Sequence, residues 1–210
     1  MAVRLPAEQR RRQLLDVGLQ VFAERGFHAT SMDDVALAAG VTKPVLYQHF
    51  PNKRGMYLTL LEDVGYQLLT ELGAATSQAK HPHDQVEAGF LAYFRYVHRN
   101  RAGFRLLFGA SVRNDSEFAE VADQTVADAA AAISGLIEID GPEAQRLALA
   151  HALIGVAEST ARWALSRDED FDPRQLALWV AQMVWYGLRG VSPVEVETSD
   201  DWRERLIGSL

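Results

Sequence analysis

Apolar side chains recur along this chain at the three- and four-residue spacing of helices. Residues 84–100 show it clearly, with Val86, Phe90, Tyr93, Phe94 and Val97 falling on one side of a helical wheel. Alternating runs of β-branched residues, which are typical of strands, are few, and alanine and leucine dominate. The pattern predicts an all-α protein.

Capping residues divide this pattern into separate helices. Ser31 with Asp34 three residues later resembles a capping box, Thr42 and Asn52 are suitable N-caps, and Gly26 and Gly40 are suitable ends. The helices predicted for the first part of the chain are residues 7–25, 32–39, 43–50 and 53–78. Those predicted for the rest are residues 84–100, 104–108, 117–137, 142–166 and 173–189, with one further turn near residues 202–207.

The second and third of these helices are short and are joined by the turn Gly40-Val41-Thr42, as in a helix-turn-helix. In residues 43–50, Leu46 and Phe50 share one face and support the helix from inside. The opposite face carries groups suited to the major groove of DNA, because it combines hydrogen-bonding side chains with small apolar ones. We expect Gln48 to read adenine, Lys43 to reach a base or phosphate, Pro44 and Val45 to touch thymine methyls, and Tyr47, His49 and Lys53 to hold phosphates.

Charge is distributed unevenly along the chain. The formal net charge is -7, yet residues 1–54 hold 8 Lys and Arg against 5 Asp and Glu, a net of +3, and the remainder has a net of -10. A basic head on an acidic body is expected when one end meets a polyanion, although charge alone leaves chance as an alternative. The absence of cysteine excludes disulfides, thiolate nucleophiles and thiolate zinc sites. The arginine-rich start has no long apolar run behind it, so we expect a cytoplasmic protein without a membrane partner.

The head resembles the TetR (TetR/AcrR-type) family of bacterial transcriptional regulators over residues 13–57. The resemblance rests on four stretches: Phe22-Ala23-Glu24-Arg25-Gly26-Phe27, Thr30-Ser31-Met32-Asp33-Asp34-Val35-Ala36, Ala39-Gly40-Val41, and Leu46-Tyr47-Gln48-His49-Phe50-Pro51-Asn52-Lys53. It implies a helix-turn-helix DNA-binding domain over residues 1–52 and a helical ligand-binding and dimerisation domain over residues 53–210. The positions that match the family's contacts with double-stranded DNA are Ser31, Thr42, Lys43, Pro44, Val45, Tyr47, Gln48, His49 and Lys53.

The same resemblance implies a homodimer, in which two such helices enter successive major grooves of a near-palindromic operator, about 34 Å apart. It also implies a cavity in the body whose small-molecule effector weakens DNA binding. We therefore expect a ligand-responsive regulator, more specifically a repressor.

The body resembles the actinobacterial branch of the family that regulates fatty-acid and lipid metabolism, which includes a regulator responding to acyl-CoA. This resemblance lies in Gly103-Phe104-Arg105-Leu106-Leu107-Phe108 and Ala161-Arg162-Trp163. It implies an apolar or amphipathic effector such as a fatty acyl compound. The predicted cavity walls are Phe90, Tyr93, Phe94, Phe104 and Phe108, with Trp163 as a lid or edge; the alternative is that these aromatic residues are plain core.

Two more sets of residues have alternative interpretations. His151, Glu158 and Arg162 share a helical face that we expect to be partly buried, where they orient a ligand head group or contact a partner subunit; alternatively, Glu158 and Arg162 are a surface pair. In the last long helix, the resemblance makes one apolar stripe a dimer surface, whereas periodicity alone also permits an internal bundle face. That stripe consists of Leu176, Val180, Met183, Val184 and Gly187, with Trp179, Trp185 and Tyr186 adding bulk.

Enzyme signatures are missing from the sequence. It contains no Glu-x-x-His pair, no glycine-rich phosphate loop and no Gly-x-Ser-x-Gly turn. His81 and His83 have a spacing that permits metal binding, but a loop before the next helix explains them as well. We therefore expect no catalytic residues, no metal and no cofactor. The competing hypothesis is a helical-bundle enzyme or metal-binding protein with an incidental helix-turn-helix.

Overall fold

A computed structural model describes residues 6–167 and 170–189. These residues form ten helices and no strand, so the all-α prediction is confirmed. The first four are α1 (Ala7–Ala29), α2 (Met32–Ala38), α3 (Lys43–His49) and α4 (Lys53–Gln78). They are followed by α5 (Pro82–Arg99), α6 (Arg101–Leu107), α7 (Ala110–Arg113), α8 (Ser116–Ser134), α9 (Glu143–Leu165) and α10 (Pro173–Arg189).

The predicted helix boundaries hold best where a capping residue sets them. Helices α4 and α10 have the predicted bounds, and Ser31 and Asp34 form the predicted capping box of α2. Helix α8 ends at Ser134, three residues early, and the single turn α7 was not predicted. At Gly26 the backbone leaves helical geometry with φ 78°, as its position predicted, but residues 27–29 then resume helical structure. The turn predicted near residues 202–207 lies outside the described residues.

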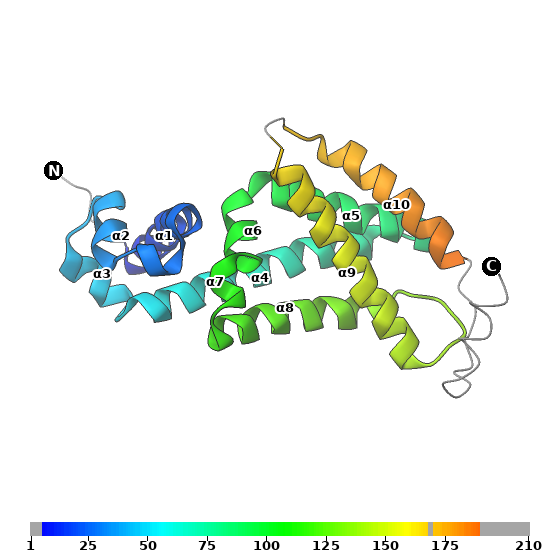
Figure 1. The fold of residues 1–210 in the computed structure, drawn as a ribbon, viewed down its shortest axis with the longest axis horizontal. Coiled ribbons are helices and arrows are strands. Elements are labelled where there is room, and N and C mark those ends of the chain that lie inside the picture. Colours follow the sequence, from blue (N-terminus) through cyan, green and yellow to red (C-terminus); the bar gives the residue numbers. More distant parts are fainter. Residues whose placement is uncertain (1–5, 168–169, 190–210) are drawn as a thin grey trace, which may run out of the picture.

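The helices separate into a small head and a longer body (Figure 1). Helices α1, α2 and α3 pack at one end, and α4 runs from this head into the body. In the body, α5 packs between α4 and α10, while α8 packs against α4 and α9. One apolar core runs through both parts, from Leu14 in α1 to Val184 in α10. The head is therefore fixed to the body by continuous packing, as well as by the chain.

Helices α4 and α8 are in close contact at Gly65. A Cβ atom placed on Gly65 would lie 2.5 Å from the Oγ1 atom of Thr125, so only glycine fits without a shift. Thr125 is buried, and its hydroxyl donates a hydrogen bond to the carbonyl of Val121, 3.1 Å away in the same helix. This contact places the middle of α8 directly against the long helix that leads to the head.

The apolar stripe predicted for the last long helix is divided between two faces of α10. Leu176, Val180 and Val184 are buried within their own chain, because this side of α10 packs on α5. Met183, at the edge of this side, is exposed. For Leu176, Val180 and Val184 the stripe is therefore an internal bundle face, as periodicity alone permitted, whereas Met183 and Gly187 are exposed. The exposed large apolar residues of α10 are Leu178, Trp179, Met183 and Tyr186.

No helix within the described parts of the chain is long and apolar enough to cross a membrane.

Candidate functional site

Helices α2 and α3 are held as a rigid pair by local sequence signals. The Ser31 hydroxyl accepts a hydrogen bond from the amide of Asp34, whose carboxylate in turn accepts one from the Ser31 amide. Gly40 has φ 63° in the turn, a conformation that favours glycine. Leu46 is fully buried beneath α3. The turn and the buried face together fix which side of α3 is presented outward.

The outward side of α3 carries most of the side chains predicted to contact DNA. Lys43, Pro44, Tyr47 and Gln48 are exposed, and Tyr47 is exposed over 40% of its surface although it is aromatic. Pro44, Tyr47 and Gln48 come one, four and five residues after Lys43, so all four share one side of the helix. Among the other predicted contacts, Ser31 and Thr42 are exposed, whereas Val45 and His49 are half-buried at the edges of this side.

Lys43 is already engaged by a neighbouring acid. Its Nζ lies 2.8 Å from Oδ1 of Asp33 in α2, and the hydrogen bond that it donates to this carboxylate raises the pKa of Lys43. Both side chains are largely exposed, so the pair is weak in water and readily exchanged. A phosphate at this position would compete with Asp33 for the ammonium group.

Lys53 is tied into the head more firmly. Its Nζ donates hydrogen bonds to the carbonyls of Phe27 and Thr30, at 2.8 Å each, and lies 4.3 Å from the centre of the Phe27 ring. A cation here also complements the negative end of α1. The sequence indicated a phosphate contact, and the structure shows in addition a structural role that spacing did not reveal. Ser31, Lys43, Tyr47 and Lys53 line one shallow hollow at the end of the head.

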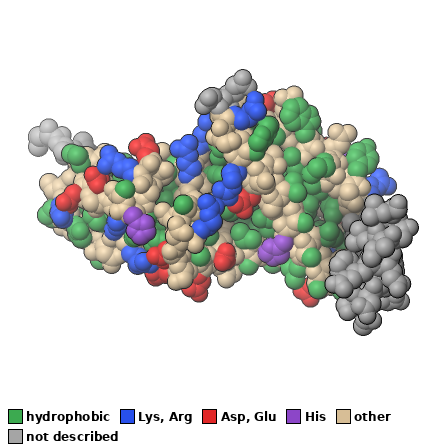
Figure 2. Space-filling view, viewed as in Figure 1, with side chains coloured by type: hydrophobic (Ala, Val, Ile, Leu, Met, Phe, Trp, Pro, Cys, Tyr) green, Lys and Arg blue, Asp and Glu red, His purple; other side chains and the backbone are tan. Residues whose placement is uncertain are grey.

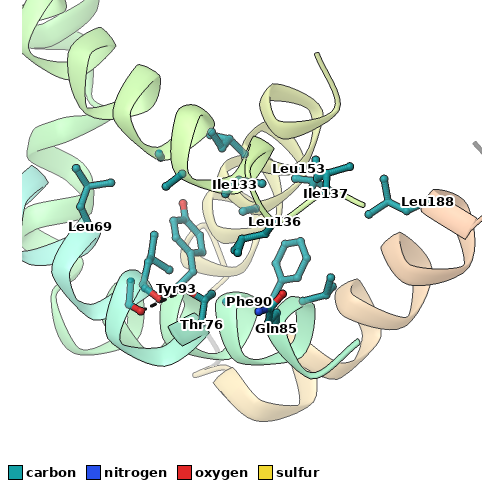
Figure 3. A pocket seen from close by; sticks show the side chains of 18 of the residues that line it. Leu69, Thr76, Gln85, Phe90, Tyr93, Ile133, Leu136, Ile137, Leu153 and Leu188 are labelled. Atoms are coloured by element: carbon teal, nitrogen blue, oxygen red, sulfur yellow. Dashed lines mark hydrogen bonds between the residues drawn. The ribbon is translucent and has the colours of Figure 1, made fainter. Parts of the chain in front are cut away.

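The body encloses a cavity of about 440 Å³ between α4, α5, α8, α9 and α10 (Figure 3). This is within the range of small-molecule sites, which run from about 300 to 1,000 Å³. The walls are almost entirely apolar. Helix α4 contributes Leu68, Leu69 and Leu72, and α5 contributes Val86, Phe90 and Tyr93. The other helices contribute Val126, Ala129, Ala132 and Ile133 of α8, Leu153, Ile154 and Ala157 of α9, and Leu188 of α10.

Three of the aromatic residues predicted to form the cavity line it, namely Phe90, Tyr93 and Phe108. Phe94 and Phe104 do not: both are buried in the core away from the cavity. The reason is that α5, which carries Phe94, lies between α4 and α10 and is buried on more than one side, while α6, which carries Phe104, packs on α1 and α4. Helical periodicity identifies buried positions but does not tell which of them border an empty space.

The polar cluster predicted on α9 also lies outside the cavity. His151 and Arg162 are exposed, and Arg162 pairs with Glu158 on the surface. Trp163 is 53% exposed, with the guanidinium of Arg167 over its ring. The expectation of a partly buried face holds for Glu158, which is half-buried, and was wrong for His151 and Arg162, because α9 turns its alanines inward. Its buried residues are Ala150, Ala157, Ala161 and Ala164.

The walls formed by α4 and α8 were missed at the level of sequence. Leu68 and Leu72 are four residues apart, as are Ala129 and Ile133, so the helical spacing that marked the aromatic residues was present here too. Aliphatic side chains at this spacing are typical of any helical core, so the pattern alone does not distinguish a cavity wall. Their role depends on the separation of α4 from α8, which the chain reaches only in the folded state.

The head and body meet around Phe118, at the start of α8. Its ring centre is 4.8 Å from that of Phe27 and 4.6 Å from that of Tyr57. Arg54 of α4 pairs with Asp115, the N-cap of α8, and with Glu117. This junction and the cavity therefore share α8: its first turn contacts the head, and residues 125–133 line the cavity.

His81 is the N-cap of α5, and His83 lies in the first turn of this helix and not in the loop predicted before it. His83 lies edge-on to Trp185, with its ring nitrogens 3.6 Å from Asp84 and Glu87 oxygens. Within residues 6–167 and 170–189, no three His, Asp or Glu side chains are grouped to hold a metal ion.

A helix-turn-helix head continuous with a helical body that holds an apolar cavity is the architecture of ligand-responsive bacterial regulators. The family model described as "Bacterial regulatory proteins, tetR family" matches residues 14–60, and the model "Tetracyclin repressor-like, C-terminal domain" matches residues 82–187. The chain is 34% identical over 193 residues to the HTH-type transcriptional activator FasR of Mycolicibacterium smegmatis, covering 90% of this chain and 87% of FasR. The chain therefore belongs to the tetR family of transcriptional regulators.

Solved structures share this fold along nearly the whole chain. A TetR-like regulator from Rhodococcus sp. RHA1 has a TM-score of 0.74 at 25% identity, covering 90% of this chain and all of that one. The regulator FadR of Bacillus subtilis, solved in complex with stearoyl-CoA, has a TM-score of 0.71 at 15% identity, covering 82% and 96%. At 15% identity, the similarity to FadR shows a shared fold alone.

Proposed function

We propose that this protein is a homodimeric, cytoplasmic transcriptional regulator that binds a near-palindromic operator through α3 and is released by an apolar effector in the body cavity. The observation that carries the proposal is the shared helix α8, which lines the cavity with Thr125, Ala129 and Ile133 and contacts the head through Phe118. A ligand that changes the packing of α8 acts on both regions at once. The ligand can shift the equilibrium between two arrangements of α8 only by as much as its affinities for these arrangements differ.

The proposed DNA contacts are supported by the exposure of α3. Gln48 and Tyr47 stand out from a helix whose inner face is fixed by Leu46, as base reading in a major groove requires. Lys43 and Lys53 border the same hollow and supply positive charge for phosphates.

The homodimer is supported by the exposed apolar side chains of α10. Trp179 and Met183 are each 59% exposed, and Tyr186 is 67% exposed. In Figure 2, hydrophobic side chains lie over α10 on the face of the molecule that is turned towards the viewer. Soluble monomers rarely leave large apolar residues grouped in this way, because covering them is favourable. Two-fold association through α10 would place two heads at a fixed separation, as a near-palindromic operator requires.

The effector class is supported by the chemistry of the cavity walls, which suit an acyl chain better than a charged metabolite. The stearoyl-CoA bound by the FadR structure is consistent with this choice. Binding to the operator represses or activates transcription, depending on where the operator lies relative to the promoter. We propose repression, in which the bound dimer blocks the promoter, although the relative FasR is named as an activator.

The test begins with native mass spectrometry of the protein from its expression host, which reads subunit number and bound small molecules together. We expect a dimer. Selection from a pool of random DNA duplexes for binding to the protein should then enrich a near-palindromic sequence. In a fluorescence-anisotropy titration, dodecanoyl-CoA should release the protein from that duplex. A reporter gene behind the selected operator should be repressed by the protein.

Matched variants separate the dimer surface from folding. Trp179→Arg combined with Met183→Arg should give a folded monomer that no longer binds the palindrome, whereas Gln124→Arg, on an exposed part of α8, should stay dimeric. A monomeric wild-type protein, or the absence of any enriched duplex, would contradict the proposal.

A further inference from the structure

Tyr93 is the polar exception in the cavity. It projects from α5 into the space that the labelled side chains surround (Figure 3), yet its hydroxyl has no hydrogen-bond partner in the part of the chain that the structure describes. Only 8% of the surface of this residue is exposed. Buried hydroxyl groups are nearly always hydrogen-bonded, since an unpaired one forfeits its bonds to water. A partner from outside the protein would remove this penalty.

The other polar side chains of the cavity are already occupied. The hydroxyl of Thr76 donates to the carbonyl of Leu72 at 3.0 Å, and that of Thr125 donates to the carbonyl of Val121 at 3.1 Å. The Gln85 amide donates to the carbonyl of Ala79, 3.5 Å away. These groups have their donors directed at the backbone of helices. Among the hydroxyl and amide groups of the described lining, Tyr93 Oη is thus the donor left for a ligand. Trp185 and Arg189 also line the cavity, but Trp185 packs edge-on against His83 in the first turn of α5, away from Tyr93.

The state of this hydroxyl decides what it binds. Burial raises the pKa of Tyr93, and the negative charge of Glu158 raises it further, while Arg162 partly opposes this. The group is therefore neutral and remains a donor throughout the physiological range, so a ligand that supplies an acceptor oxygen satisfies it.

The charge around the cavity decides which acceptor is favoured. The charged residues in its lining are Asp128 and Glu138, which are acidic, and Arg189, the last residue of α10. Pro82, the first residue of α5, also lines the cavity. It is eleven residues from Tyr93, which is roughly 16 Å of helix. Arg189 belongs to this far end, because its guanidinium lies over the ring of Trp185, which packs against His83 in the first turn of α5. Among the described residues, no cation of the lining would lie next to a carboxylate beside Tyr93, since Arg162 is outside the lining and is paired with Glu158. Burying an unpaired charge is costly.

We propose that Tyr93 Oη is the polar anchor of the cavity and selects an apolar effector whose buried oxygen is an uncharged acceptor, as in the carbonyl of a thioester, ester or ketone. This inference rests on the proposed function, and it names the chemical group that the effector presents inside the cavity.

The test uses three probes with the full-length protein. Diphenylhexatriene is a hydrocarbon that fluoresces in apolar surroundings and reports whether the cavity accepts an apolar molecule. Displacement of it by 2-undecanone and by undecanoate then compares a neutral carbonyl with a carboxylate on chains of equal length. We expect 2-undecanone to displace the dye at a concentration at least about tenfold lower than undecanoate.

The informative variant is Tyr93→Phe, and Tyr96→Phe is its matched control. Tyr96 is on the same helix, but its hydroxyl donates to the carbonyl of Val64 and it does not line the cavity. In Tyr93→Phe, the dye should bind as in wild type while 2-undecanone binds about tenfold more weakly, the loss expected for one hydrogen bond. The midpoint of thermal unfolding should not fall, because no partner is lost. Tyr96→Phe should lower that midpoint and leave the ketone affinity unchanged.

The outcomes separate the two proposals. If diphenylhexatriene does not bind, the cavity takes no apolar ligand, and the proposed effector class fails together with this inference. If the dye binds but Tyr93→Phe does not weaken 2-undecanone, the effector class stands and Tyr93 is not its anchor. Equal displacement by undecanoate in wild type would contradict selection for an uncharged acceptor.

Discussion

The guanidinium of Arg54, at the start of α4, donates two hydrogen bonds to the carboxylate of Asp115, the N-cap residue of α8. Nη2 lies 2.6 Å from Oδ2 and Nη1 lies 3.1 Å from Oδ1, so the pair has two parallel hydrogen bonds. Such bidentate pairs fix orientation as well as distance. Asp115 also accepts hydrogen bonds from the amides of Glu117 and Phe118. The pair therefore joins the helix that leaves the head to the helix that lines the cavity.

Asp115→Asn should weaken the coupling between effector and DNA. Asparagine is a good N-cap and preserves the start of α8, but it removes the negative charge that Arg54 holds. We expect the variant to bind the selected operator, while the fold-change in operator affinity caused by dodecanoyl-CoA becomes smaller. Fluorescence anisotropy with and without the effector measures this. Asp123→Asn, an exposed position on the same helix, is the control and should retain the full response.

Acid should remove the contribution of this pair to stability. The hydrogen bond from Arg54 lowers the pKa of Asp115 below its ordinary value of 3.8. A carboxyl group whose pKa is lower in the folded than in the unfolded state stabilises the protein fully above the unfolded value. That stabilisation is lost as the pH falls from about 3.8 through the folded pKa. In urea unfolding, the difference between wild type and Asp115→Asn should be constant above pH 5 and shrink below pH 4. A difference that grew in acid would contradict this assignment.

Lys53→Met should reduce both stability and DNA binding. The loss of two hydrogen bonds from Lys53 to the end of α1 should lower the free energy of unfolding by about 1 to 3 kcal/mol. Loss of a phosphate contact should also reduce the salt dependence of operator binding by about one unit of slope. Lys80→Met, at an ordinary position between α4 and α5, serves as the control. An unchanged salt slope combined with reduced stability would restrict Lys53 to the structural role.

Gln48→Ala should weaken operator binding without changing the salt slope. A base contact is uncharged, and its loss costs about 1 to 3 kcal/mol, roughly tenfold to a hundredfold in affinity. The effect should be confined to duplexes that carry the base pair read by Gln48, which substituted operators would identify. Gln20→Ala makes the same change on an exposed face of α1 and should bind as wild type. Equal weakening on all sequences would indicate a backbone contact instead.

Gly65→Ala should destabilise the body where α4 and α8 meet. The new methyl group would lie 2.5 Å from Thr125 Oγ1, and relief requires the two helices to separate. Overpacking of this kind costs about 1 to 3 kcal/mol. The same substitution at Gly73, further along α4, meets no atom within 4 Å and should stabilise by up to about 1 kcal/mol. Thermal unfolding of the pair measures the difference, and equal effects would show that α4 and α8 adjust freely.

The sequence by itself determined the helices of this protein and the chemistry of its head. Ser31, Asn52 and Gly26 act on their immediate neighbours, so their effects on helix ends are local and readable without a fold. The outward position of Gln48 followed in the same way from its spacing to Leu46. Local periodicity and capping are the interactions that a linear pattern contains.

Only the tertiary structure decided which buried residues face a cavity and which groups join head to body. Phe90 lines the cavity and Phe94, four residues later, does not, because the positions of α4, α8 and α10 decide where space remains. Arg54 and Asp115 are 61 residues apart, and no spacing rule connects them. The physical reason is that cavities and long-range pairs depend on how whole helices pack, and helix packing is a property of the complete core.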